Sequence, residues 1–122
     1  MPSVDLVKPA EVSISKLRDA FEDVYGPAFL KVLDFYMSLE NGERSHLGFL
    51  SMVTERPRKA YEGLIKFFKS ESAVKVLWGT VLAKFVPNRA FEMASRLLEV
   101  LMNDDREGVL GLFSEILDPF RL

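Results

Sequence analysis

The segment Ser70–Pro87, with the sequence SESAVKVLWGTVLAKFVP, decides how this 122-residue chain folds. Apolar residues fill almost every helical position from 73 to 86, and charged or hydroxyl side chains interrupt the run only at Lys75, Thr80 and Lys84. A helix that is apolar on nearly all sides is normally central in its fold. We therefore expect this helix to be central in the fold.

Short signals mark the ends of this helix and of its two neighbours. Ser70 or Ser72 can cap its start, because a serine oxygen accepts hydrogen bonds from the free amides of a first helical turn. Pro87 ends it, and Asn88 can cap the helix that follows. Pro57 suits the first position of the preceding helix. The apolar faces expected for these two neighbours are Ala60, Tyr61, Leu64, Ile65, Phe67 and Phe68, and then Phe91, Met93, Ala94, Leu97, Leu98, Leu101 and Met102.

A last helix is predicted after residue 104. Asp104, with Glu107 three residues later, resembles a capping box, and both acids would lie at the positive end of the helix. The apolar residues of this helix are Val109, Leu110, Leu112, Phe113, Ile116 and Leu117, and Asp118-Pro119 follows them.

The start of the chain predicts an arm and one helix. Pro2, Pro9 and weak periodicity indicate an extended arm over residues 1–12. Ser13 or Ser15 would then cap a helix that carries Leu17, Ala20, Phe21 and Val24.

Two more helices are predicted before Pro57. Gly26-Pro27 begins the first, and Asn41-Gly42 would end it, since glycine accepts the left-handed conformation of a helix stop. A shorter helix is expected over Ser45–Val53. The broad apolar face of the first consists of Phe29, Leu30, Val32, Leu33, Tyr36, Met37 and Leu39.

Together these elements predict an all-α protein, a compact bundle of about six to seven short helices without a β-sheet. Residues 1–12 form the arm and residues 13–122 a single helical domain, since this length is enough for one hydrophobic core. Gly63 and Gly79 lie inside helices, where glycine costs about 1 kcal/mol relative to alanine. We expect both to allow close helix–helix contact.

The composition is that of a soluble globular protein, with 48% apolar and 28% charged residues. No stretch approaches the roughly 20 apolar residues of a membrane span, and residues 1–8 lack the pattern of a signal peptide. We therefore expect a cytoplasmic protein. Cysteine and glutamine are absent and asparagine is scarce, a depletion typical of heat-adapted proteins, so a thermophilic source is a further hypothesis.

The chain lacks the residue constellations that most enzymes need. Without cysteine it has neither disulfides nor thiolate sites. Glu43 and His46, the only histidine, form one Glu-x-x-His pair, whereas a carboxylate di-metal bundle needs two. No Gly-x-Gly-x-x-Gly or Walker loop occurs. We predict a non-enzymatic protein without catalytic, cofactor-binding or metal-binding residues; a carboxylate metal enzyme is the alternative that elemental analysis would test.

Charge is sorted by position along the chain. Residues 56–89 carry eight bases and two acids, a net charge of +6. Residues 1–55 carry five bases and nine acids, and residues 90–122 carry three and seven, so each end has a net charge of −4. Such an asymmetry points to a partner of opposite charge.

Five side chains of this basic segment are the candidate partner-binding residues: Arg56, Arg58, Lys59, Lys66 and Lys69. The three lysines share one helix face with Glu62, because they are spaced three or four residues apart. This face could be a solvated cover of the core, or could bind a protein or a nucleic acid.

Nucleic-acid binding has one further argument for it and two against it. Phe67, Phe68 and Trp78 lie nearby in sequence and resemble a base-stacking platform. Their spacing, however, is that of core residues. The pI near 5.5 also argues against a dedicated nucleic-acid binder, which is usually strongly basic.

A series of signals in the later two-thirds of the chain carries a family resemblance. The signals are Gly26 with Leu30 and Leu33, Val53-Thr54 before Pro57, Leu64 with the run 73–86, and Gly108, Leu110, Gly111 and Leu112 before Asp118-Pro119. In this order, over Tyr25–Pro119, the chain resembles the helical family catalogued as domain of unknown function 1641. The resemblance implies a small all-helical protein of archaea and bacteria, similar to proteins encoded near formate dehydrogenase and sulfide–quinone oxidoreductase. It carries no catalytic residues and implies an accessory role beside such a redox enzyme.

The leading functional hypothesis is a helical protein–protein interaction or accessory module that self-associates or docks on an acidic partner. In the self-associating version, the basic middle of one copy meets an acidic end of another. The alternative is a nucleic-acid-binding protein that uses the basic segment 56–89.

Overall fold

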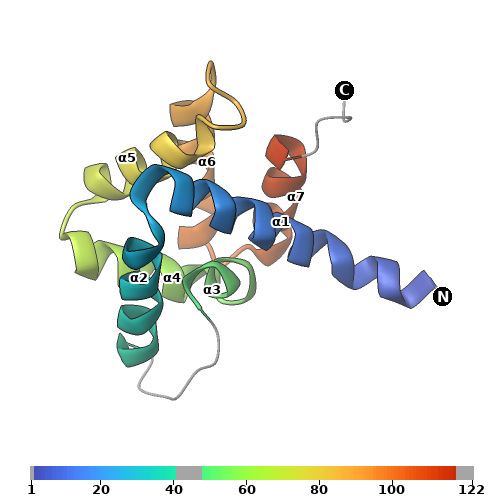
Figure 1. The fold of residues 1–122 in the computed structure, drawn as a ribbon, viewed down its shortest axis with the longest axis horizontal. Coiled ribbons are helices and arrows are strands. Elements are labelled where there is room, and N and C mark those ends of the chain that lie inside the picture. Colours follow the sequence, from blue (N-terminus) through green and yellow to red (C-terminus); the bar gives the residue numbers. More distant parts are fainter. Residues whose placement is uncertain (1, 41–47, 118–122) are drawn as a thin grey trace.

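Seven helices follow one another in the computed structural model, which describes residues 2–40 and 48–117 (Figure 1). Over these residues there is no β-strand, so the prediction of an all-α helical bundle is confirmed for them. The helices are α1 (Pro2–Tyr25), α2 (Pro27–Glu40), α3 (Phe49–Glu55), α4 (Pro57–Phe68), α5 (Glu71–Leu82), α6 (Ala90–Met102) and α7 (Arg106–Leu117).

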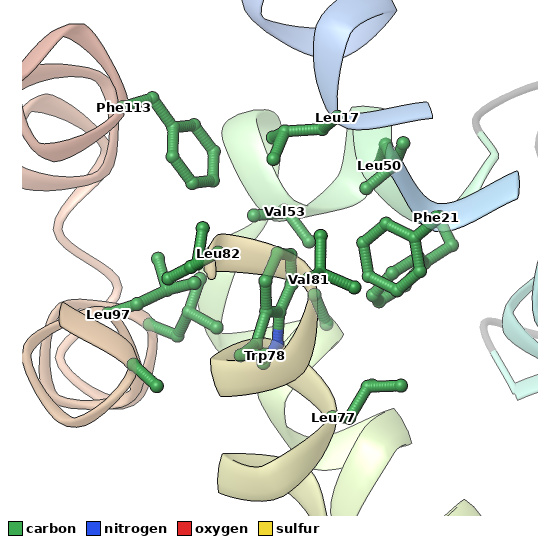
Figure 2. Close-up of a cluster of buried hydrophobic side chains, with 14 of the residues drawn as sticks. Leu17, Phe21, Leu50, Val53, Leu77, Trp78, Val81, Leu82, Leu97 and Phe113 are labelled. Atoms are coloured by element: carbon green, nitrogen blue, oxygen red, sulfur yellow. The ribbon is translucent and has the colours of Figure 1, made fainter. Parts of the chain in front are cut away.

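The helices pack around the indole of Trp78, which is fully buried (Figure 2). The rings of Phe21 on α1 and Phe49 on α3 lie 5.3 and 5.8 Å from it, between ring centroids. The ring of Phe113 on α7 lies 6.4 Å away. Large aromatic side chains dominate the energetics of a core, and here they join residues from both halves of the chain. The buried apolar side chains of all seven helices belong to one cluster.

Helix α5 is central on one side and exposed on the other. It packs against α1, α4 and α6, and it buries Val74, Leu77, Trp78, Val81 and Leu82. On the opposite side Val76 is 53% exposed, so the helix is central, as predicted, without being covered on every side. The helix also ends at Leu82, and residues 83–85 form a turn before Pro87.

Helix α1 begins at Pro2, so the predicted extended arm over residues 1–12 is wrong from residue 2 onward. Pro2 takes the first helical position, where its missing N–H costs no hydrogen bond. Pro9 lies inside the helix, where a single proline kinks a helix rather than necessarily ending it. Ser13 and Ser15, predicted as caps, lie well within α1. The first turns of α1 extend past the other helices (Figure 1).

The helix caps confirm one prediction and correct two. The Ser70 Oγ accepts a hydrogen bond of 3.1 Å from the Ala73 N–H, so Ser70 caps α5 as predicted. Asn88 does not cap α6, which follows Arg89 without a side-chain cap. The capping box at Asp104 is wrong by one residue. Asp105 takes this role for α7, and its Oδ1 accepts a hydrogen bond of 2.9 Å from the Gly108 N–H.

Helix α3 is almost entirely buried, and a side chain of another helix caps its start. It covers Phe49–Glu55, so its end lies two residues beyond the predicted Ser45–Val53. The start of that prediction and the predicted stop at Asn41-Gly42 lie outside the described residues. The Asp34 Oδ1 on α2 accepts a hydrogen bond of 2.7 Å from the Phe49 N–H. A carboxylate at this position satisfies a free amide and complements the positive end of the helix.

The glycines inside α4 and α5 make room for side chains of neighbouring helices. A Cβ atom on Gly63 would lie 2.6 Å from the Met37 Sδ on α2. A Cβ atom on Gly79 would lie 2.5 Å from the Phe91 ring on α6. Both distances are well below the optimal separation of about 3.5–4.0 Å between non-bonded carbon atoms. The prediction that these glycines allow close helix–helix contact is confirmed.

Candidate interaction surfaces

The predicted basic residues divide between two parts of helix α4. Arg56, Arg58 and Lys59 line a cleft of about 270 Å³ at the start of the helix. Lys66 and Lys69 lie at its other end and do not line this cleft. Among the described residues, the five predicted side chains therefore do not form one site.

Arg58 is held by contacts inside the protein. Its Nε donates to the Glu62 Oε2 one turn later, at 3.1 Å. Its Nη1 donates to the carbonyl oxygen of Met102, the last residue of α6, also at 3.1 Å. A guanidinium at a helix C-terminus satisfies free carbonyl groups and complements the negative end of the helix. Arg58 thus joins the start of α4 to the end of α6.

Asp104 completes this junction from the turn between α6 and α7. Its Oδ1 accepts a hydrogen bond of 3.2 Å from the backbone N–H of Arg58. The N-cap residue of α4, Arg56, supplies no side-chain cap of its own, so the carboxylate of Asp104 takes that place. The φ angle of Asp104 is 55°, a left-handed conformation that aspartate adopts more readily than most residues.

The cleft at the start of α4 has mixed charge. Its other lining residues are Glu55, Glu62 and Asp104, so three carboxylates face the three bases. Such a lining does not concentrate a polyanion, because each basic side chain has an acid nearby. Among the described residues, the side chains of Arg56 and Lys59 make no ion pair, and both are exposed. They are the two bases of the cleft that can meet a partner.

The middle of α4 contains a tyrosine whose pKa is clearly raised. The Tyr61 hydroxyl donates to the Glu71 Oε2 on α5 at 2.9 Å. Partial burial raises the pKa of Tyr61 above its ordinary value of 10.0, and the hydrogen bond and negative charge of Glu71 raise it further, while Arg58 lowers it. The hydroxyl therefore stays protonated and ties α4 to α5 at neutral pH.

The aromatic residues near the basic segment are engaged with other rings. Trp78 is fully buried, so it cannot stack on a nucleic-acid base. The Phe67 ring packs on Tyr36 with 5.0 Å between centroids. The Phe68 ring lies 6.5 Å from that of Phe29. Phe67 and Phe68 join α4 to α2 rather than form an open platform.

A row of apolar side chains on α2 is exposed. Val32 is 51%, Phe35 66% and Leu39 62% exposed, and they follow one another at spacings of three and four residues. Ala28, four residues before Val32, is exposed as well. We call these four residues the α2 row. The buried residues of α2, among them Leu33 and Met37, lie on the opposite side of the helix.

The α2 row corrects the sequence analysis. Val32 and Leu39 were expected on the buried face of this helix, and Phe35 was not among the residues expected there. The row 28, 32, 35 and 39 has the a/d spacing of a heptad, but the buried residues 30, 33 and 37 are also three and four residues apart, so spacing alone does not separate the two sides. The buried Leu30, Leu33 and Met37 follow a different helical row.

A second exposed apolar pair lies on α5 and α6. Phe91 is 55% exposed, although its ring covers Gly79, and Val76 lies one turn before that glycine. Phe91, Met102 and Leu110, which the sequence analysis grouped with the apolar residues of their helices, are exposed. Of these exposed apolar residues, the α2 row contains the most on a single helix.

The described residues contain neither a membrane-spanning helix nor a metal-ligand cluster. None of the helices has the length and hydrophobicity needed to cross a membrane. No three His, Cys, Asp or Glu side chains gather as a metal site in the described part of the chain. Glu43 and His46 lie outside that part.

Comparisons with known proteins add no relative. The chain matches no model of a protein family, no curated protein and no solved structure.

Proposed function

We propose that this protein is a non-enzymatic helical module that binds another protein surface through the α2 row. The observation that supports the proposal is the exposure of Val32, Phe35 and Leu39, each more than half exposed on one side of a 14-residue helix. Isolated apolar side chains are normal on a protein surface, whereas contiguous apolar patches mark interaction sites.

The basic residues have a secondary part in this proposal. Arg56 and Lys59 are exposed and make no ion pair with described residues, so they can guide an acidic partner toward the protein. Exposed ion pairs contribute only about 0–1 kcal/mol each. The apolar side chains of the α2 row therefore supply most of the binding free energy, through burial of their surface.

An accessory role beside a redox enzyme is a narrower version of the proposal. It is supported only by the resemblance of residues 25–119 to the family described above. The α2 row suits such a role, because an accessory subunit needs an exposed surface for docking and no active site.

Nucleic-acid binding through residues 56–89 is the alternative. The contacts of Arg58 with Glu62 and Met102, and the three carboxylates of the cleft, weigh against it. If it were correct, a gel shift with DNA or RNA would appear at low salt and weaken steeply as salt is added.

Photocrosslinking in native cells tests the proposal. A photoreactive amino acid replaces Phe35 in the α2 row or, as a matched control, the exposed Glu99 on α6. We expect discrete crosslinked protein adducts from position 35 and none from position 99. Equal labelling from the two positions, or no adduct from position 35, would refute a role of the α2 row in protein binding.

A further inference from the structure

We propose that the partner of the α2 row is the α2 row of a second copy of this chain, packed antiparallel about a two-fold axis. This inference rests on the proposed function and names the partner of the same surface. The pairing is supported by the register of the row, the sizes of its side chains and the chemistry of its two flanks.

The register of the α2 row is that of a helix-pairing seam. Ala28, Val32, Phe35 and Leu39 occupy successive d, a, d and a positions of a heptad, and all four are exposed. Two helices pair along such a seam when each side chain inserts between those of the facing helix. The row therefore has the pattern of a helix that pairs with another helix.

The side-chain sizes fit an antiparallel pair. In that arrangement a positions face d positions, so Ala28 meets Leu39 of the other copy and Val32 meets Phe35. Each layer then combines a smaller with a larger side chain. A parallel pair would instead set Phe35 against Phe35 and Ala28 against Ala28, leaving one layer crowded and another underfilled. Close packing without voids favours the antiparallel arrangement.

The residues that flank the row also favour an antiparallel pair. On one side lie Lys31 and Ser38, and on the other lie Phe29 and Tyr36, which are half-buried. An antiparallel pair places like flanks of the two copies on the same side, because g positions then neighbour g positions. The aromatic flanks meet each other and the lysine flanks stay in water. A parallel pair would set Lys31 beside Tyr36 of the other copy.

The size of the seam predicts a weak dimer. A stable interface buries about 800 Å² per partner, and a 14-residue helix is only about 21 Å long at 1.5 Å per residue. Four side chains of such a helix supply part of that area. The two copies therefore associate at high protein concentration and separate on dilution. The contact is isologous and closed, so it ends at the dimer.

Salt distinguishes this dimer from one held by opposite charges. The α2 pair brings two Lys31 side chains to the same side, so salt screens a repulsion and strengthens burial of the apolar row. An interface between the basic middle of one copy and an acidic end of another would weaken with salt. We expect the dimer to persist or tighten as salt is raised.

Disulfide trapping tests the arrangement. The chain contains no native cysteine, so only the introduced cysteines can form disulfides. Val32→Cys and Phe35→Cys proteins, with tags of different size, are mixed at high concentration and oxidised mildly. Glu99→Cys on α6 is the matched control. Circular dichroism checks that each variant keeps its helical content. Ala28→Cys mixed with Leu39→Cys gives a second, independent pair.

We expect the mixed 32–35 and 28–39 dimers to form well above the share given by random pairing, and Glu99→Cys to remain monomeric. Dimers mainly between identical positions would overturn the antiparallel register. Trapping no better than that of Glu99→Cys would overturn self-pairing. If photocrosslinking at position 35 still captured a different protein, the proposed function would stand while this inference failed.

Discussion

The carboxylate of Asp104 accepts a hydrogen bond of 3.2 Å from the backbone N–H of Arg58, 46 residues earlier in the chain. An acid in the turn between α6 and α7 thus caps helix α4, whose own N-cap residue supplies no side-chain cap. Asp34 does the same for α3 through the Phe49 N–H. Two helix starts in this small fold are therefore stabilised by side chains from outside the helix that they cap.

Asp104→Ala should lower the free energy of unfolding by about 1 kcal/mol, because it removes the cap of α4. Urea unfolding measures the change through the fluorescence of Trp78, the only tryptophan. Glu99→Ala, at an exposed position whose side chain makes no contact among the described residues, is the control. Equal stability of the two variants would show that the Asp104 carboxylate does not cap α4.

Arg58→Ala should destabilise the protein more than Lys59→Ala. Arg58 loses its hydrogen bond to the Met102 carbonyl and its pair with Glu62. Lys59 is the next residue and is also exposed. Its side chain makes no hydrogen bond or ion pair with the described residues. A difference of about 0.5–1.5 kcal/mol is expected from one net hydrogen bond. No difference in the urea midpoints would mean that solvent competes fully for these contacts.

Gly63→Ala and Gly111→Ala should differ although both add one methyl group to a helix. A Cβ on Gly111 meets nothing within 4 Å, so this variant should gain about 1 kcal/mol from the higher helix propensity of alanine. A Cβ on Gly63 would lie 2.6 Å from the Sδ of Met37, which is fully buried. The flexible end of Met37 must then move within the core, and this cost offsets some or all of the same propensity gain.

Thermal and urea unfolding measure both glycine variants. Gly111→Ala is expected to be the more stable of the two variants. A Gly63→Ala protein stabilised as much as Gly111→Ala would show that the Met37 side chain does not pack closely against Gly63.

The hydroxyl of Tyr61 should make stability sensitive to alkaline pH. Its pKa is raised in the folded protein, first by burial and then by Glu71, so the folded state prefers the protonated ring. This contribution is complete below the unfolded pKa of about 10. It is lost as pH rises through the higher folded pKa, since the unfolded chain then releases its proton more readily.

Tyr61→Phe removes this titration and supplies the comparison. Wild type should lose more stability than Tyr61→Phe when the pH is raised above 10, as followed by urea unfolding. Carbon NMR of the Tyr61 ring should place its titration above the ordinary value of 10.0. A pKa of Tyr61 at or below its ordinary value would contradict the contact with Glu71.

Local sequence signals predicted where helices begin better than they predicted the contacts between helices. Pro57 and Ser70 begin or cap helices as expected, because these residues act on the turn next to them. The turn at residues 103–105 contains two adjacent aspartates, and local sequence alone placed the cap one residue early. The bond of Asp104 to Arg58 joins residues far apart in sequence, and no local pattern contains it.

The same limit explains the errors at the surface. Val32, Leu39 and Phe91 have helical apolar spacing, but burial depends on which other helices are present to cover them. The broad apolar face of α2 is wider than its neighbours cover, so one side became core and the other became the α2 row. The basic segment and its Glu62 were visible in the sequence, whereas the other two carboxylates of the cleft, Glu55 on α3 and Asp104 in the α6–α7 turn, were not assigned to it.

Sedimentation velocity of wild type and Phe35→Asp over a wide range of protein concentration measures whether the α2 row pairs two copies of the chain. Phe35 is 66% exposed, so the substitution should leave the free energy of unfolding within about 0.5 kcal/mol of wild type. We expect the wild-type mass to rise from 13.9 kDa toward twice that value with concentration, at low and at high salt, while Phe35→Asp stays at 13.9 kDa. A wild-type protein that is monomeric at every concentration, or a Phe35→Asp protein that associates equally well, would show that the α2 row does not pair two copies of the chain.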